Sequence, residues 1–220
     1  NRMIFEIAVI SMLYIHHYTL YKSVTRVTNL SRLTDRQRSY ILSIPNALLV
    51  FLISLYFIQK FINNGCNLDI YKNNINQTED TLIKLTVLYL TSYFIADSII
   101  GYNNYHTQMN NIAGYPHHIF YIIINIFVLK TKMHHLYILY MIAELPTIVM
   151  GLGSYSKKYR NDSLFGFTFF LTRICSHLFL TWLIRDQKHY LYLALSVLPV
   201  HLYWFFLWCK SYFNSKKNTV

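Results

Sequence analysis

Long apolar stretches alternate with short polar segments along the whole chain. Each stretch is close to the length that an α-helix needs to cross a bilayer, roughly 20 residues. The pattern predicts seven apolar helices, at residues 3–21, 40–62, 82–102, 116–129, 133–150, 164–184 and 190–209. The fourth is the shortest, and we expect it either to cross with little tilt or to reach only part-way. The predicted fold is an all-α, polytopic membrane bundle of six or seven transmembrane helices, forming a single domain over residues 1–220.

Composition supports a membrane location. Hydrophobic residues make up 54% of the chain and charged residues only 13%, against roughly a quarter charged in soluble domains. The first apolar stretch contains Glu6, His16 and His17 and is followed by no small-residue cleavage site, which argues against a removable signal peptide. The three cysteines are too few and too scattered for a disulfide framework or a cysteine-based metal site.

The formal net charge of +11 comes from Lys and Arg residues that lie mainly between the apolar stretches. This placement indicates membrane orientation rather than nucleic-acid binding. If all seven stretches cross, one side receives eleven of these residues, among them Arg32, Arg36, Arg38 and the lysines near the carboxyl terminus, and the other side receives eight. The positive-inside rule then places the carboxyl terminus in the cytosol.

Several polar residues nevertheless lie inside the predicted helices. A charged side chain at the middle of a bilayer costs at least ~2.5 kcal/mol, so such residues indicate a functional or tightly paired site. Counting from the predicted helix ends, Asn46, Asp97, Glu144 and Arg173 lie about 8 to 14 Å from the cytosolic side. The pair His117-His118 opens the fourth helix from the same side. Five helices therefore place polar groups in one half of the bilayer, which predicts a polar cavity open toward the cytosol.

Structural roles are the alternative for each of these residues. Glu144 and Arg173 could form an ion pair for stability, and Asp97 could form a hydrogen bond with a tyrosine such as Tyr93. Adjacent residues on a helix point about 100° apart, so we expect one of the two histidines to face the cavity and the other to support it. Arg173 and His177 share a helical face and could together receive a phosphate or carboxylate. A second pair, His134-His135, falls in a short turn and is expected to be a solvated loop.

Four segments, taken in order, resemble the TLC-domain family. They are Tyr93-Phe94-Ile95-Ala96-Asp97, Gly114-Tyr115-Pro116-His117-His118, Ala143-Glu144-Leu145-Pro146-Thr147 and Phe169-Phe170-Leu171-Thr172-Arg173-Ile174. The family includes ceramide synthases, TRAM proteins and small lipid-linked membrane proteins, and the resemblance covers about residues 38–208. The resemblance to ceramide synthases implies that His117-His118 is a catalytic pair that acts on acyl-CoA and a sphingoid amine.

The chain departs from the ceramide synthase pattern, which continues to another histidine and two aspartates. Glu144, Leu145 and Ile148 stand at those places, so the chain is more similar to the small TLC-domain proteins. Those proteins also tend to have a histidine where this chain has Asn46. The richness of this chain in Ile, Asn, Tyr and Lys suggests a protist or giant-virus source.

Two hypotheses for function follow from the residues and the resemblance. The hypothesis we favour is a non-enzymatic protein of an endoplasmic-reticulum-like internal membrane. It would bind a lipid or influence the composition of the membrane. The alternative is a ceramide-synthase-like N-acyltransferase in sphingolipid metabolism, with acyl-CoA as co-substrate. The candidate catalytic residues are His117, His118 and Asp97, and the candidate substrate-binding residues are Glu144, Arg173, Asn46, His177 and Tyr93. We expect membrane lipids as partners, no bound cofactor and no metal. A seven-span receptor is disfavoured because Cys66 alone cannot form an extracellular disulfide.

Overall fold

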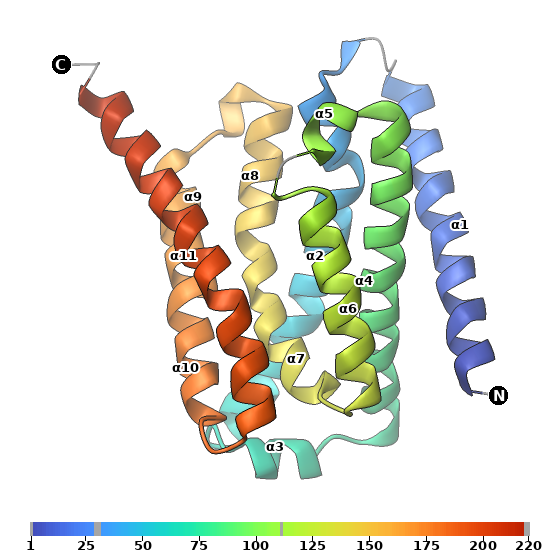
Figure 1. Ribbon diagram of the computed structural model, residues 1–220, viewed down its shortest axis with the longest axis vertical. Coiled ribbons are helices and arrows are strands. Elements are labelled where there is room, and N and C mark those ends of the chain that lie inside the picture. Colours follow the sequence, from blue (N-terminus) through green and yellow to red (C-terminus); the bar gives the residue numbers. More distant parts are fainter. Residues whose placement is uncertain (1, 29–31, 111, 218–220) are drawn as a thin grey trace.

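The apolar stretches form long helices that run roughly along one axis of the molecule (Figure 1). The computed structural model describes residues 2–28, 32–110 and 112–217, and these residues form helices and loops but no strand. The elements are α1 (Arg2–Thr28), α2 (Asp35–Asn63), α3 (Leu68–Asn73), α4 (Gln77–Asn104), α5 (His106–Met109), α6 (Tyr115–Lys130), α7 (His134–Tyr140), η2 (Met141–Glu144), α8 (Leu145–Tyr155), η3 (Lys157–Tyr159), α9 (Asp162–Phe169), η4 (Phe170–Cys175), α10 (Ser176–Leu183) and α11 (Lys188–Lys217). The predicted all-α class is confirmed for the described residues.

Helix starts lie several residues outside the apolar stretches because polar caps extend the helices. At the start of α2, the Thr34 side chain accepts a hydrogen bond from the Gln37 backbone N–H, and the Gln37 side chain accepts one from Thr34. Asn76 and Glu79 form the same reciprocal box at the start of α4. Such boxes satisfy backbone donors that a helix start would otherwise leave unpaired.

Six of the helical stretches in the described residues are long and apolar enough to cross a membrane, with η2 joining α7 to α8 and η4 joining α9 to α10. The remaining predicted helix, α6, has only 16 residues and spans about 24 Å at 1.5 Å per residue. It lies beside α4 within the bundle (Figure 1). Helix α1 begins and helix α11 finishes at opposite ends of the bundle (Figure 1).

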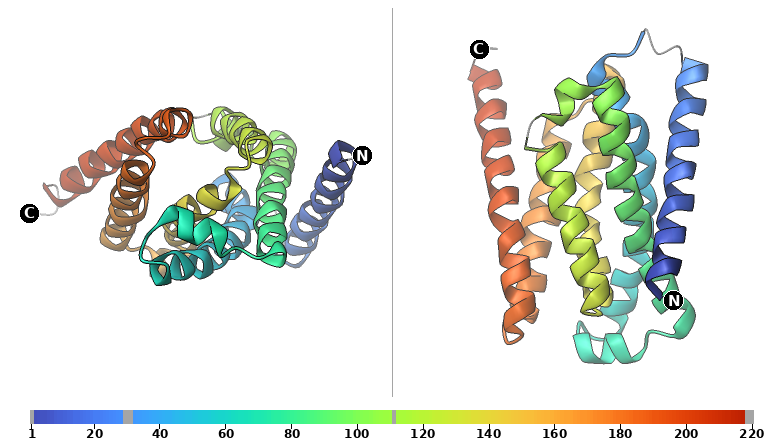
Figure 2. Two further views of the ribbon diagram at one scale, coloured as in Figure 1. Left: turned by 90° about the horizontal axis from the view of Figure 1, so that it is seen from below. Right: turned by 45° about the vertical axis from the view of Figure 1, so that its right-hand side comes forward.

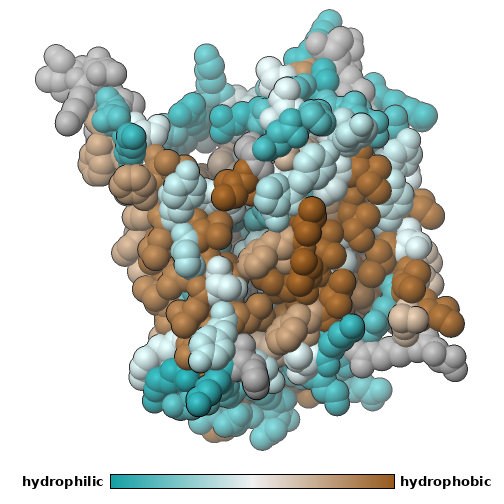
Figure 3. All heavy atoms as spheres, viewed as in Figure 1, coloured by the Kyte–Doolittle hydropathy of each residue, from teal (hydrophilic) through white to brown (hydrophobic). Residues whose placement is uncertain are grey.

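Helix α4 is the centre of the bundle, and α1 lies at its edge. In the most apolar window of α4, 67% of residues are buried, against 6% for α1. The end-on view in Figure 2 shows α1 outside α4, with α10 and α11 on the other flank. Brown apolar side chains form a belt around the middle of the visible face, with teal hydrophilic ones at both ends (Figure 3). This distribution is that of a protein surrounded by hydrocarbon.

Two helices are irregular in their interior, and both irregular segments carry a predicted polar residue. Glu144 ends the 3₁₀ segment η2. It precedes Pro146, which lacks a backbone donor and whose ring crowds the preceding turn. Arg173 lies in the π-helical segment η4, and π-bulges occur frequently at functional sites.

The contact between α9 and α11 depends on a glycine. A Cβ atom added at Gly166 would lie 2.0 Å from the ring of Trp208. We expect Gly166→Ala to lower the free energy of unfolding by about 1–3 kcal/mol, as overpacking does, measured by thermal unfolding in detergent. The cost should shrink in the background Trp208→Ala, and equal costs in both backgrounds would contradict this packing.

Candidate functional site

A buried polar network links α4 to the start of α6. Asp97 Oδ1 accepts a 2.5 Å hydrogen bond from the Tyr105 hydroxyl, and Asp97 Oδ2 lies 3.5 Å from His118 Nε2. The other ring nitrogen of His118 lies 2.9 Å from Ser98 Oγ. Asp97 and His118 are each only 4% exposed. The network thus gives a buried carboxylate the partners that burial demands.

Tyr105, just after α4, is the hydrogen-bond donor in this network. Burial, and next the Asp97 carboxylate, raise the pKa of its phenol. Tyr105 therefore stays protonated at neutral pH and can donate to Asp97. Tyr93, which the sequence offered as the partner of Asp97, instead shares a 2.8 Å hydrogen bond with Ser43. The expected hydrogen bond between Asp97 and a tyrosine is confirmed, but Tyr93 was the wrong tyrosine, because the one that reaches Asp97 follows α4.

A narrow cavity lies next to this network, bounded by α6, the α7–η2 segment, the η4–α10 segment and α11. Its volume is about 80 Å³ for water-sized occupants, several times the ~10–15 Å³ that one water needs. One end is polar and is lined by His117, Glu144, Arg173 and His201. The rest is mostly apolar, with Val128, Met133, Leu136, Ile184, Leu193 and Val197 among its lining residues.

The apolar part continues to Met133 and Ile184, which adjoin the turns between α6 and α7 and between α10 and α11. These turns lie at the end of the bundle away from α5 (Figure 1). The cavity is therefore not confined to the half of the bundle that holds its polar groups. The prediction from helix depth located the polar residues alone, because apolar lining residues have no distinguishing pattern in a membrane helix.

Arg173 is held from three directions. Its Nε donates to the Ala143 carbonyl at 2.8 Å and one Nη donates to Thr147 Oγ1 at 2.9 Å. Its guanidinium also lies over the rings of Phe169 and Trp204, at 5.1 and 5.9 Å from their centroids, a geometry that stabilises a cation. A guanidinium has five N–H donors, so this positioning leaves donors for an occupant of the cavity.

Glu144 is half-buried and also lines the polar end of the cavity. Within the described part of the chain, no ion pair joins Glu144 to Arg173, although the sequence left that pairing open. The hydrogen bonds of Arg173 to Ala143 and Thr147 take the place of the pair. A carboxylate and a guanidinium thus border one space without neutralising each other directly.

The two adjacent histidines have different environments. His117 lines the cavity and packs against Tyr121 and Trp204, with ring centroids 4.5 and 5.6 Å away. His118 faces Asp97 and is buried. Asp97 therefore orients the histidine that does not line the cavity. Their catalytic roles stay predictions.

The other three candidates are also placed. His177 lines the cavity and is buried, and its Nε2 donates to the Ala194 carbonyl at 2.9 Å. Asn46 is buried in α2, outside the cavity lining, and its side-chain oxygen has no partner among the described residues. Tyr93 is likewise buried outside the lining. Its ring centroid lies 5.2 Å from that of Phe94, which does line the cavity. A role for Asn46 or Tyr93 in binding stays a prediction.

Residues 38–211 match the sequence model of the TLC domain, the TRAM/LAG1/CLN8 group. The match spans most of the chain. The chain belongs to the TLC-domain family. The resemblance predicted from the four motifs is confirmed, and its limits of about 38–208 agree closely with the match. No curated protein and no solved structure gives a significant match. The family match and the six apolar helices together make this an integral, multi-pass membrane protein.

Sequence reasoning missed two residues at the polar end of this TLC-domain protein's cavity. His201 lines the cavity, and Trp204 packs against two of the lining residues. Both come from α11. The Nδ1 of His201 donates to the Arg173 backbone carbonyl at 3.0 Å, and Trp204 contacts both His117 and Arg173. A histidine within an apolar stretch is a signal that could have identified His201. The tryptophan carried no comparable signal, because aromatic residues are common near the ends of membrane helices.

The hydroxyl of Tyr105 can be tested separately from its ring. We expect Tyr105→Phe to lower the free energy of unfolding by about 1–3 kcal/mol, because it removes a donor from the buried Asp97. Thermal unfolding in detergent measures the loss. Tyr21→Phe is a matched control, since Tyr21 is equally buried at 1% exposed and its hydroxyl has no partner among the described residues. Equal effects of the two substitutions would contradict the role of Tyr105.

Proposed function

We propose that this TLC-domain protein binds a single-chain lipid, or one acyl chain of a larger lipid, in the cavity between α6 and α11. The observation that carries the proposal is the cavity's amphipathic lining. Arg173 and Glu144 border one end, and aliphatic side chains line most of the remainder. A lipid has the same division between headgroup and chain.

The narrow apolar part suits one extended hydrocarbon chain better than two side by side. Transfer of apolar surface from water to such a lining is favourable by roughly 25 cal/mol per Å². A chain already in the bilayer gains less, because its surroundings are apolar to begin with. Selectivity is therefore expected to come from the polar end.

The polar end can contact two kinds of headgroup atom. The remaining donors of Arg173 suit an anionic or carbonyl oxygen, and the Glu144 carboxylate accepts from an ammonium, amide or hydroxyl group. His117 can donate or accept at neutral pH. We therefore favour an amine-, amide- or hydroxyl-bearing headgroup that also carries an acceptor oxygen.

The second candidate is the N-acyltransferase that ceramide synthases exemplify. His117 lines the cavity, which favours the acyltransferase candidate, because an imidazole can act as acid, base or nucleophile. Against it, Asp97 contacts His118, and Glu144, Leu145 and Ile148 replace the family's downstream histidine and aspartates. Lipid binding therefore remains the first proposal.

Substitution of Glu144 gives the cleanest test of lipid binding. Glu144→Gln keeps the side chain's size and removes its charge, and no described contact of the protein is lost. We expect it and His117→Ala to retain roughly tenfold less lipid, as the loss of one charge-assisted hydrogen bond implies. The measurement is mass spectrometry of lipids extracted from protein purified in mild detergent.

Asp186→Asn is the control, since its side chain is 88% exposed. Unchanged lipid content in both cavity variants, with normal elution in gel filtration, would refute the binding proposal. An acyl adduct on His117, or acyl-CoA turnover abolished by His117→Ala, would favour the enzymatic candidate instead.

We also propose that the carboxyl terminus faces the cytosol from an endoplasmic-reticulum-like membrane. The excess of Lys and Arg at that end of the bundle supports this orientation. In sealed microsomes, we expect a carboxyl-terminal tag to be digested by added protease. A tag inserted at Gly65, in the loop after α2, should be protected until detergent is added. The reverse pattern of protection would contradict the proposed orientation.

A further inference from the structure

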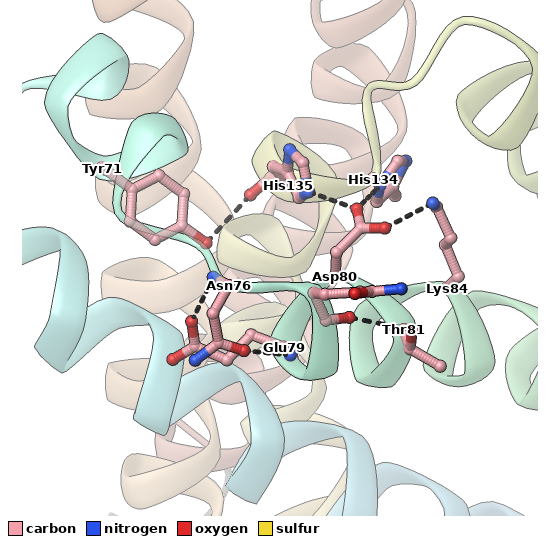
Figure 4. A network of polar contacts seen from close by, with 9 residues as sticks. Tyr71, Asn76, Glu79, Asp80, Thr81, Lys84, His134 and His135 are labelled. Carbon is pink, nitrogen blue, oxygen red and sulfur yellow. Dashed lines mark hydrogen bonds and ion pairs between the residues drawn. The ribbon is translucent and has the colours of Figure 1, made fainter.

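Three side chains converge at the end of the bundle opposite α5, outside the lipid cavity. Asp80 Oδ1 lies 2.7 Å from His134 Nε2 and 2.7 Å from His135 Nε2 (Figure 4). One ligand atom of each residue lies within 4.8 Å of those of the other two. The histidine pair does not form the solvated loop that the sequence predicted. His134 is only 2% exposed.

The turn between α6 and α7 explains how adjacent histidines can share one target. Lys132 has a φ of 60°, and the Met133 N–H donates to the Val128 carbonyl at 2.9 Å. This tight turn sets the two histidines as the first residues of α7. Their rings lie 4.2 Å apart and are inclined by 59°, so both Nε2 atoms reach the same carboxylate.

The backbones that carry these ligands are fixed by a further layer of hydrogen bonds. Asp80 lies in the first turn of α4, beside the capping box of Asn76 and Glu79. Glu79 is in turn bound by Lys60 and, at 2.7 Å, by the hydroxyl of Tyr56. On the other side, the Tyr71 hydroxyl donates to the His135 carbonyl at 3.2 Å (Figure 4). Such support preorganises a site before a ligand arrives.

Two imidazoles and a carboxylate form a ligand set typical of Zn²⁺ and related divalent transition metals. In catalytic zinc sites, three protein ligands leave a fourth position for water. Mg²⁺ and Ca²⁺ prefer all-oxygen sets, so the two ring nitrogens disfavour them. We propose that Asp80, His134 and His135 bind a divalent transition-metal ion of the zinc class, which fastens the α6–α7 turn to α4.

Two features limit the affinity of this site. The Lys84 ammonium contacts the second oxygen of Asp80 and repels a nearby dication. In addition, Nδ1 of His134 is buried without a partner among the described residues, and an incomplete outer layer weakens metal binding by roughly 10- to 100-fold. Lys84 is 39% exposed and can turn toward solvent when the metal enters.

The proposal predicts opposite effects of neighbouring substitutions on Zn²⁺ binding. The protein, carrying an affinity tag without histidine, binds one Zn²⁺ per chain in isothermal titration calorimetry and in elemental analysis after dialysis. Asp80→Asn and His135→Ala abolish that binding. Lys84→Met tightens it by roughly tenfold, because a competing charge is removed. His16→Gln, from the exposed member of another adjacent pair, leaves it unchanged.

Folding is controlled by gel filtration and thermal unfolding without metal. Zn²⁺ should raise the unfolding temperature of the wild-type chain and not that of Asp80→Asn. No zinc binding by the folded wild-type chain, or binding that survives in both Asp80→Asn and His135→Ala, would overturn the proposal. Lipid content is not a readout of this experiment, so the result is independent of the proposed function.

Discussion

An ionisable side chain inside a bundle that faces hydrocarbon needs polar partners, and this requirement organises the structure. Water is not available to solvate a carboxylate there, so the helices must supply donors. Asp97 obtains them from Tyr105 and His118, and Arg173 obtains acceptors from Ala143 and Thr147. These contacts join α4 to α6 and η4 to the η2–α8 segment, so the rotation of each helix about its axis follows from where its polar groups must point.

Depth along a helix could be predicted from the sequence, but rotation about its axis could not. The rise per residue placed Asp97, Glu144 and Arg173 at similar depths, and the apolar stretches gave the helices. Whether a side chain faces a cavity or a neighbour depends on packing between helices, which one sequence does not specify. His117 and His118 illustrate this limit. Their divergence was expected from helix geometry, but only the structure assigns His117 to the cavity and His118 to Asp97.

Local irregularity was a second limit. The π-helical turn around Arg173 and the 3₁₀ turn before Pro146 change the direction of the side chains they carry. Pro146 signalled the second irregularity, but residues 170–175 contain neither Gly nor Pro to signal the first. The prediction of a solvated loop at residues 134 and 135 was wrong for a related reason. The burial of this histidine pair depends on Asp80, which is distant in sequence and close in space.

Helix α1 lies outside the matched TLC region, which begins at residue 38, and it packs mainly on α4. In Figure 1, α2 begins at the same end of the bundle at which α11 finishes. Helix α1 begins at the opposite end of the bundle and runs along it once. The end of the bundle from which the described chain starts therefore depends on α1, the least buried of the six candidate spans.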